Sequence, residues 1–272
     1  MLAQLKKGMV VFSCAFFLSG CSIKNGEFIS KSFEAIFIVP MQRLLSLFSS
    51  WCGDQFGFGI ILLVLLVRLC LLPFMIRQSK ASHRIRRIKP VVAPLINQVK
   101  QHLKEAQTPK EKEKAHQQLM RLYKQYGMHP YQMMLGCLPA LLQFPILLGL
   151  LYAIKHPSQH FLMTELMFLG YDLRYPALVL TLLAGLLYFI QPLVNIGNFQ
   201  HKRMSIILSV LMPLFIMTAA MQTPSAIALY WITNASFLII QMACTNFIFG
   251  KRAQREALQL EQYLNHKTKK KQ

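Results

Sequence analysis

One charged residue, Arg68, stands inside a long apolar run that extends from Phe56 to Ile76. An arginine at the centre of a lipid bilayer costs about 2.5–3.5 kcal/mol on scales derived from membrane insertion. The other apolar runs contain no Asp or Glu that could pair with it. Its charge must therefore be met by water, by backbone carbonyls or by a ligand. Because an unpaired arginine attracts acidic or polar residues of an incoming polypeptide, we interpret Arg68 as functional.

The other polar side chains of the apolar runs are uncharged, and among them are Gln143, Gln191, Asn195, Thr233, Asn234 and Gln241. Such groups normally face the interior of a helix bundle, where they hydrogen-bond across helices or line a wet cavity. For any single one of these residues, a hydrogen bond between helices is a simpler interpretation than the lining of a cavity. Together with Arg68 they could form a hydrophilic cavity that is open to water. The absence of acidic residues from these runs removes the usual proton relay of a coupled transporter.

Five apolar runs reach the length of about 20 residues that a transmembrane helix needs. They cover residues 58–76, 131–154, 176–197, 204–222 and 224–249. Of the 272 residues 54% are hydrophobic, which argues against a soluble domain. The sequence therefore predicts an all-α membrane protein built as a bundle of five transmembrane helices.

The N-terminal segment has the layout of a signal peptide. Lys6 and Lys7 precede a short apolar run, and the segment ends in Leu-Ser-Gly followed by Cys21. This ending resembles the lipobox of bacterial lipoproteins, which implies cleavage after residue 20 and a lipid, with palmitate among its acyl chains, on Cys21. The alternative is an uncleaved first span that ends in an incidental cysteine.

The distribution of charge predicts the orientation in the membrane. Residues 77–130 carry 13 basic and 3 acidic side chains, and residues 250–272 carry 7 basic and 2 acidic ones. Residues 24–57 and 155–175 are each balanced, at 3 against 3 and 2 against 2. The basic segments are therefore expected in the cytoplasm, with a lipid-anchored N-terminus outside a bacterial plasma membrane. The basic C-terminal end is also suited to contact anionic lipids or a polyanion such as ribosomal RNA.

The basic segment 77–130 is predicted to be a cytoplasmic helical hairpin. Its first helix should cover roughly 82–107 and bend where two prolines interrupt it. Its second helix has Thr108 and Glu111 spaced as a capping box, and Gly127 is placed to end it with a left-handed residue.

The external segment before the first span, residues 21–57, has apolar residues at helical spacing. They predict an amphipathic helix in the outer interface, with Pro40 as a break or kink and Trp51 at headgroup depth.

The predicted organisation is as follows: signal peptide 1–20, external lipid-anchored amphipathic segment 21–57, span 58–76, cytoplasmic hairpin 77–130, span 131–154, external loop 155–175, span 176–197, short cytoplasmic loop 198–203, spans 204–222 and 224–249, and basic cytoplasmic tail 250–272.

Three stretches resemble the YidC/Oxa/Alb family of membrane protein insertases. They are YGMHPYQMMLGCLPALLQFPI from residue 126, PSAIALYWITNASFLIIQ from residue 224, and VRLCLLPF from residue 67. The resemblance covers essentially the whole mature chain in order, and the lipobox without a large outer domain is similar to the short Gram-positive form. Two positions differ from the family pattern. His129 occupies a position where Asn is usual, and Ala226 occupies one where Gly is usual.

The resemblance implies a groove that opens to the cytoplasm and the lipid, in which Arg68 is the positive charge and Gln143 and Trp231 line the wall. Gln191 and Asn234 are the further polar residues that we assign to this groove. The implied function is insertion and folding of membrane proteins, alone or with the Sec translocon. Nascent membrane proteins, membrane lipids and, through the basic tail, the ribosome are the expected partners.

The sequence bears on two other classes of function. An enzyme is disfavoured, because the sequence has neither a G-x-S-x-G nor an H-E-x-x-H motif, and neither a cofactor nor a metal is expected. A small-solute or ion channel or carrier is the stronger alternative, although inverted repeats are not evident and five spans are awkward for a duplicated carrier.

Overall fold

The computed structural model describes residues 34–128, 138–155, 166–194 and 202–269. Most of these residues are helical. The elements are η1 (Glu34–Ile38), α3 (Val39–Trp51), α4 (Phe56–Glu105), α5 (Pro109–Gln125), α7 (Leu138–Lys155), β1 (Met167–Phe168), β2 (Tyr171–Asp172), α8 (Leu178–Val194), α9 (Lys202–Met221) and α10 (Ser225–Lys269). The predicted signal peptide, the lipidation site Cys21 and His129 lie outside the described residues.

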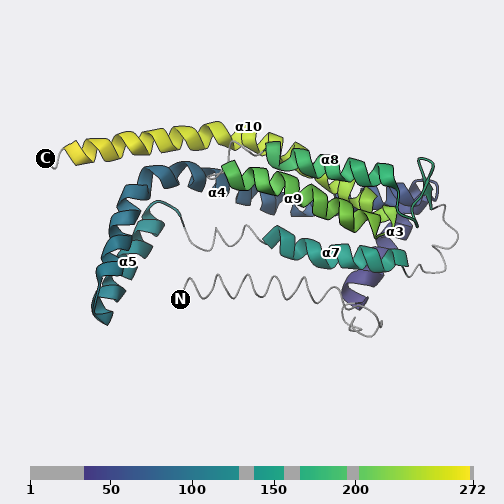
Figure 1. The fold of residues 1–272 in the computed structure, drawn as a ribbon, viewed down its shortest axis with the longest axis horizontal. Coiled ribbons are helices and arrows are strands. Elements are labelled where there is room, and N and C mark those ends of the chain that lie inside the picture. Colours follow the sequence, from purple (N-terminus) through teal and green to yellow (C-terminus); the bar gives the residue numbers. More distant parts are fainter. Residues whose placement is uncertain (1–33, 129–137, 156–165, 195–201, 270–272) are drawn as a thin grey trace.

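The helices form an elongated bundle (Figure 1). Helix α4 packs along α10, α10 packs on α8, and α8 packs on α9. Helix α7 lies along the same bundle. At one end α3 lies across the bundle, and at the other end α5 and the last part of α4 turn away from it. Of the two hydrophobic cores found among the residues given above, the larger joins α3, α4, α7, β1, α8, α9 and α10. The all-α fold class is therefore confirmed for the described residues.

Two helices, α4 and α10, are long and apolar enough to cross a membrane by length and composition. Shorter apolar helices are α8 and the part of α9 from Ser209 to Met221. Large apolar side chains of α8 and α9 face away from the core, among them Leu182, Leu186, Val210, Leu211 and Phe215. Such exposed apolar faces fit contact with lipid acyl chains rather than with water.

The first predicted span and the first hairpin helix form one helix. We expected the span to end at residue 76 and the hairpin helix to begin near residue 82, whereas α4 continues for 50 residues from Phe56 to Glu105. Residues 77–81 contain neither Gly nor Pro, so nothing in the backbone ends the helix there. The internal prolines Pro73, Pro90 and Pro94 remain within it, and α4 bends where it leaves the bundle (Figure 1).

The segment before α4 begins with a π-helical turn, η1, that passes directly into α3. Pro40 lies in the first turn of α3, where its fixed φ fits the helical backbone. The expected break at Pro40 does not occur, because the change from π-helix to α-helix lies before it, between Ile38 and Val39, and α3 continues through Pro40. Trp51, at the end of α3, is largely exposed, and its ring contacts Phe48 edge to face.

A small β-hairpin closes the end of the bundle near α3. Strands β1 and β2 are antiparallel, with Phe168 opposite Tyr171, and Leu169 and Gly170 form the turn with positive φ angles of 50° and 82°. The Phe168 ring lies against Gly57, where a Cβ atom would overlap with it. The hairpin also caps α10, because the backbone N–H of Ala226 donates to the Leu173 carbonyl over 3.1 Å. This hairpin was not predicted, since the segment read only as an external loop.

The second helix of the predicted hairpin, α5, confirms the predicted capping box. The Thr108 hydroxyl accepts a hydrogen bond from the Glu111 N–H over 3.3 Å, and the Glu111 carboxylate accepts one from the Thr108 N–H. These backbone N–H donors also lower the pKa of Glu111. Gly127 follows the helix with φ of 64°, which confirms the left-handed end.

We expect Thr108→Ala to loosen the start of α5, because it leaves the Glu111 N–H without its side-chain acceptor. Loss of an N-cap costs about 1 kcal/mol, which is about a fivefold faster local opening. Amide hydrogen exchange of residues 110–113 measures this opening, and Thr108→Ser is the control that should retain the wild-type rate. Equal exchange rates for Thr108→Ala and wild type would show that the cap contributes nothing to the stability of the start of α5.

Candidate functional site

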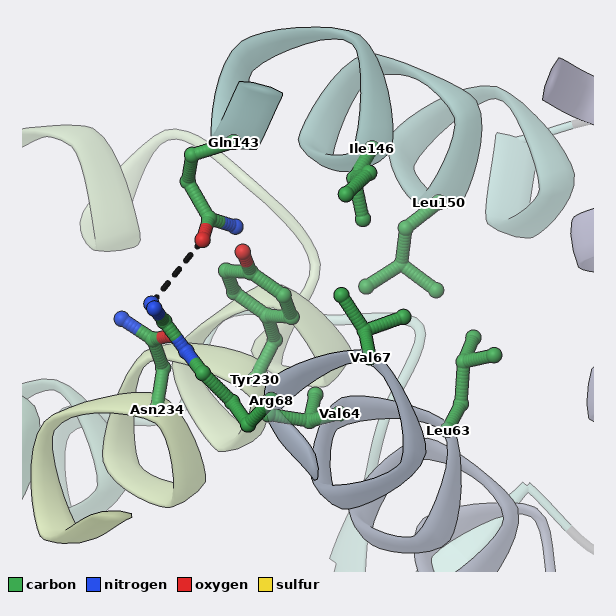
Figure 2. Close-up of a pocket in the computed structure, with 9 residues that line it drawn as sticks. All are labelled: Leu63, Val64, Val67, Arg68, Gln143, Ile146, Leu150, Tyr230 and Asn234. Carbon is green, nitrogen blue, oxygen red and sulfur yellow. Dashed lines mark hydrogen bonds between the residues drawn. The ribbon is translucent and has the colours of Figure 1, made fainter. Parts of the chain in front are cut away.

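Arg68 is buried between three helices. Its side chain projects from the middle of the apolar part of α4 and is only 5% exposed. Its Nε donates to the Asn234 Oδ1 of α10 over 2.7 Å, and its Nη2 donates to the Gln143 Oε1 of α7 over 2.9 Å (Figure 2). A second contact joins Nη2 to the same Asn234 oxygen. One guanidinium thus joins α4, α7 and α10.

The Asn234 amide is held in one orientation. While its oxygen accepts from Arg68, its Nδ2 donates to the Tyr188 hydroxyl of α8 over 3.0 Å. Asn234 is only 3% exposed, so both ends of its amide are satisfied inside the bundle. The polar network therefore extends through four helices and needs the donor side of Asn234 as well as its acceptor side.

The charge of Arg68 is solvated but not neutralised by these partners. Amide oxygens are dipoles, so the positive charge remains, whereas a carboxylate would cancel it. The sequence contains no Asp or Glu between Asp54 and Glu105, none in residues 138–155 and none between Asp172 and Glu256. The arrangement can therefore hold an anionic or strongly polar group of a ligand.

A small cavity adjoins this network between α7 and the α4–α10 pair (Figure 2). Its volume of about 10 Å³ is enough for about one water molecule. Arg68, Gln143, Asn234 and Tyr230 form its polar side, and its apolar side consists of Leu63, Val64, Val67, Ile146 and Leu150. The Tyr230 residue is only 3% exposed, and its hydroxyl has no hydrogen-bond partner in the described structure. The site is thus amphipathic, and it is narrow in this conformation.

The predicted site residues divide into two groups. The structure brings Arg68, Gln143 and Asn234 into direct contact. Trp231 belongs to the main core cluster, and Gln191 is half-buried on α8; neither is among the residues that line the cavity in the described structure.

Sequence reasoning missed two residues of this site, Tyr188 and Tyr230. Tyr230 lies four residues before Asn234, which places both on the same face of α10. This spacing was a signal that could have identified it. Tyr188 could not be found in this way, because its contact with Asn234 depends on the packing of α8 against α10.

A second polar contact lies beyond the apolar part of α4. His83 is only 4% exposed and hydrogen-bonds with Asn246 of α10, whose Nδ2 donates to the Val194 carbonyl at the end of α8 over 2.9 Å. Burial lowers the pKa of His83, and the nearby charges of Arg86 and Arg87 lower it further, against the opposing effect of the Asn246 hydrogen bond. This contact joins α4, α8 and α10 at the end of the bundle where α4 leaves it.

We expect the folded protein to lose stability as the pH falls below about 6.5, the usual pKa of histidine. The pKa of His83 is lowered in the folded protein, so the unfolded chain takes up the proton first as the pH falls. The stability that neutral His83 contributes is therefore complete above this pH and is lost below it. Thermal unfolding in detergent between pH 7.5 and 5.5 measures the loss. His83→Gln should show a smaller fall in Tm than wild type, and an equal fall would exclude His83 as the cause.

Other kinds of site find no support in the part of the chain that the structure describes. No group of three or more His, Cys, Asp or Glu side chains there could hold a metal ion. The cysteines Cys52, Cys70 and Cys244 are free. The Arg68 network with its cavity is therefore the candidate functional site.

Comparison with known proteins finds one matching family model and relatives in two species. A family model described as 60Kd inner membrane protein matches residues 47–252. A protein of Staphylococcus epidermidis strain RP62A, named membrane protein insertase YidC 1, is 38% identical over 249 residues, which are 91% of this chain and 90% of the relative. Membrane protein insertase YidC of Staphylococcus aureus strain JH9 is 37% identical over 243 residues, covering 88% of this chain and 84% of the relative.

Proposed function

Because this chain belongs to the 60Kd inner membrane protein family, the YidC/Oxa/Alb insertases, we propose that it inserts membrane proteins through the site at Arg68. Its function is that of a membrane protein insertase, and nascent membrane proteins are its substrates. The family is not an enzyme family in the usual sense, and the mechanism below needs no bond-breaking step. The observation that carries the proposal is the positive charge of Arg68, buried and held by neutral amides beside a cavity.

In this mechanism a substrate has an apolar segment and a short polar flank that must cross the membrane. Moving a polar group out of water without a hydrogen bond costs several kcal/mol. Arg68, Gln143 and Tyr230 offer that flank a charge and hydrogen-bonding groups within the apolar bundle. Meanwhile the apolar segment enters the lipid, and each central Leu or Ile gains on the order of 0.3–0.6 kcal/mol.

The cavity must widen to accept a chain, because it now holds about one water molecule. Movement of α7 is the simplest way to widen it. This helix packs chiefly on η1 and α3, whereas the pair of α4 and α10 forms the most extensive contact of the bundle. As α7 moves outward, the hydrogen bond from Arg68 to Gln143 opens and the guanidinium turns to the substrate. Gln191 and Trp231 are proposed to border the groove in this widened form.

The membrane arrangement in this proposal has five spans. They are the apolar parts of α4 and α10 together with α7, α8 and α9. The N-terminus, lipidated at Cys21, lies outside the bacterial plasma membrane with α3 in the outer interface, and the hairpin and the C-terminus lie in the cytoplasm. The balanced charge of residues 155–175 and the excess of +10 in residues 77–130 support this orientation. The Sec translocon, the ribosome and membrane lipids are the further proposed partners.

Purified protein in liposomes tests the function. A small single-span reporter with an acidic flank is added, and protease protection of the flank measures insertion. We expect insertion with the wild-type protein and none above background with empty liposomes. Leakage of ions or small solutes measured on the same liposomes tests the alternative, since leakage without insertion would indicate a channel or carrier and contradict the proposal.

A further inference from the structure

The C-terminal segment predicted as a basic tail is a helical continuation of α10. Beyond the apolar part of α10, which ends near Phe249, the helix extends to Lys269. Figure 1 shows this extension running past the ends of α8 and α9 on the side where α4 bends. We call residues 250–269 the tail helix. Its sequence is polar apart from a few residues, of which Ala253, Ala257 and Leu260 recur at helical spacing on one face.

That face is buried. Ala253 is 5% and Ala257 is 7% exposed, although the residues on either side of them are exposed. Leu260 packs against the hydrophobic cluster of the cytoplasmic hairpin, whose buried members are Ile88, Val92, Ile96, Leu119 and Met128. Small residues allow two helices to approach closely. The tail helix is therefore docked on the hairpin.

Arg84 of α4 links the tail helix to the turn that ends α5. Its Nε donates to the Glu256 Oε2 of the tail helix over 3.1 Å. The same guanidinium lies against Gly127, where a Cβ atom would overlap with it. Since both charged side chains are about half exposed, the ion pair itself contributes little, and the apolar face provides most of the contact. Tyr126 packs against the same hydrophobic cluster as Leu260 of the tail helix. Burial, and then Tyr263 of the tail helix, raise the pKa of Tyr126.

We propose that docking of the tail helix positions the cytoplasmic hairpin relative to the groove and that efficient insertion depends on it. The proposal rests on the proposed function. Its physical reason is that α4 carries Arg68 and continues into the hairpin, while α10 carries Asn234 and continues into the tail helix. The hairpin is therefore held by both of the helices that hold Arg68. Without the tail contact, the bend in α4 would leave the hairpin free to swing.

The test uses a photo-crosslinker in place of Tyr263, together with a protease site introduced within residues 195–201. After illumination and cleavage, a tail helix docked on the hairpin keeps the two fragments of the chain joined. Ala257→Glu places a charge in the buried face, and Leu258→Glu places the same charge on the neighbouring residue, which is 52% exposed. Ala257→Ser keeps the small side chain. We expect wild type, Leu258→Glu and Ala257→Ser to crosslink equally, and Ala257→Glu at least fivefold less.

The same variants are then compared for insertion of the reporter into liposomes and for Tm. Ala257→Glu should insert at least threefold more slowly, with Leu258→Glu and Ala257→Ser within twofold of wild type. The Tm of the bundle should stay unchanged, which separates positioning from general damage. Wild-type protein that fails to crosslink would overturn the docking, and crosslinking lost without slower insertion would overturn the positioning role. Insertion by wild type separately tests the proposed function.

Discussion

Arg68→Ala is expected to reduce insertion of a reporter with an acidic flank by about tenfold or more, whereas Arg68→Lys should retain most of it. A carboxylate about 4 Å from the guanidinium gains roughly 4 kcal/mol at an effective dielectric constant of 20. Even a third of this energy corresponds to about a tenfold difference in the affinity of the site for the flank. Lysine keeps the charge, although its ammonium cannot reproduce both hydrogen bonds, from Nε to Asn234 and from Nη2 to Gln143. The measurement is reporter insertion in cells depleted of any other insertase.

A matched reporter with a neutral flank provides the control. Its insertion should depend much less on the charge at position 68, because only the hydrogen-bonding part of the site then contributes. Comparable protein levels in the membrane must be verified for each variant. If Arg68→Ala inserts the acidic reporter as well as wild type does, the electrostatic part of the mechanism is wrong, and Arg68 serves structure or hydration alone.

The second large effect is expected at Asn234. Replacing it with Ala removes the acceptor of the Arg68 Nε and the donor to Tyr188 at once. A buried group that loses its partner costs about 1–3 kcal/mol, and more when it is charged. We expect Asn234→Ala to lower Tm by several degrees and to reduce insertion strongly, because the guanidinium is no longer held beside the cavity. Thermal unfolding in detergent and reporter insertion measure the two effects.

A double variant separates stability from function. Arg68→Leu combined with Asn234→Leu removes the buried charge together with its main partner, and such replacements are often neutral or stabilising. The double variant should therefore recover most of the Tm that Asn234→Ala loses, while insertion of the acidic reporter stays low. Recovery of insertion along with Tm would mean that the network only stabilises the bundle. Failure to recover Tm would mean that Asn234 stabilises the fold chiefly through Tyr188.

Local signals in the sequence predicted much of this architecture. The charge in an apolar run singled out Arg68. The rarity of polar residues in the other runs gave six candidate companions, of which the structure places Gln143 and Asn234 in contact with it. The Thr108 capping box and the left-handed Gly127 were also predicted, because each depends on residues within one turn of helix. These features succeeded because their physical cause lies close by in the sequence.

Features that depend on how distant helices pack were not predicted. The contact between Asn234 and Tyr188 requires α8 to lie beside α10, and no spacing within either helix specifies that. The continuity of α4 past residue 76 was missed because a change from apolar to basic composition marks the membrane boundary and not the end of a helix. Docking of Ala257 was missed for a related reason, since two alanines in a polar segment indicate a buried face only when a partner surface is known.

The central claim is that the polar flank of a substrate passes beside Arg68, and site-specific photo-crosslinking during insertion tests it most directly. A crosslinker replaces Val67, which lines the cavity, or Leu186, which is exposed on α8 and is not among the residues that line it. A reporter arrested during insertion carries an acidic flank of known position. We predict an adduct between position 67 and that flank, weakened by Arg68→Ala, and little or none from position 186. Equal adducts from both positions, or none from position 67 while insertion proceeds, would contradict the account.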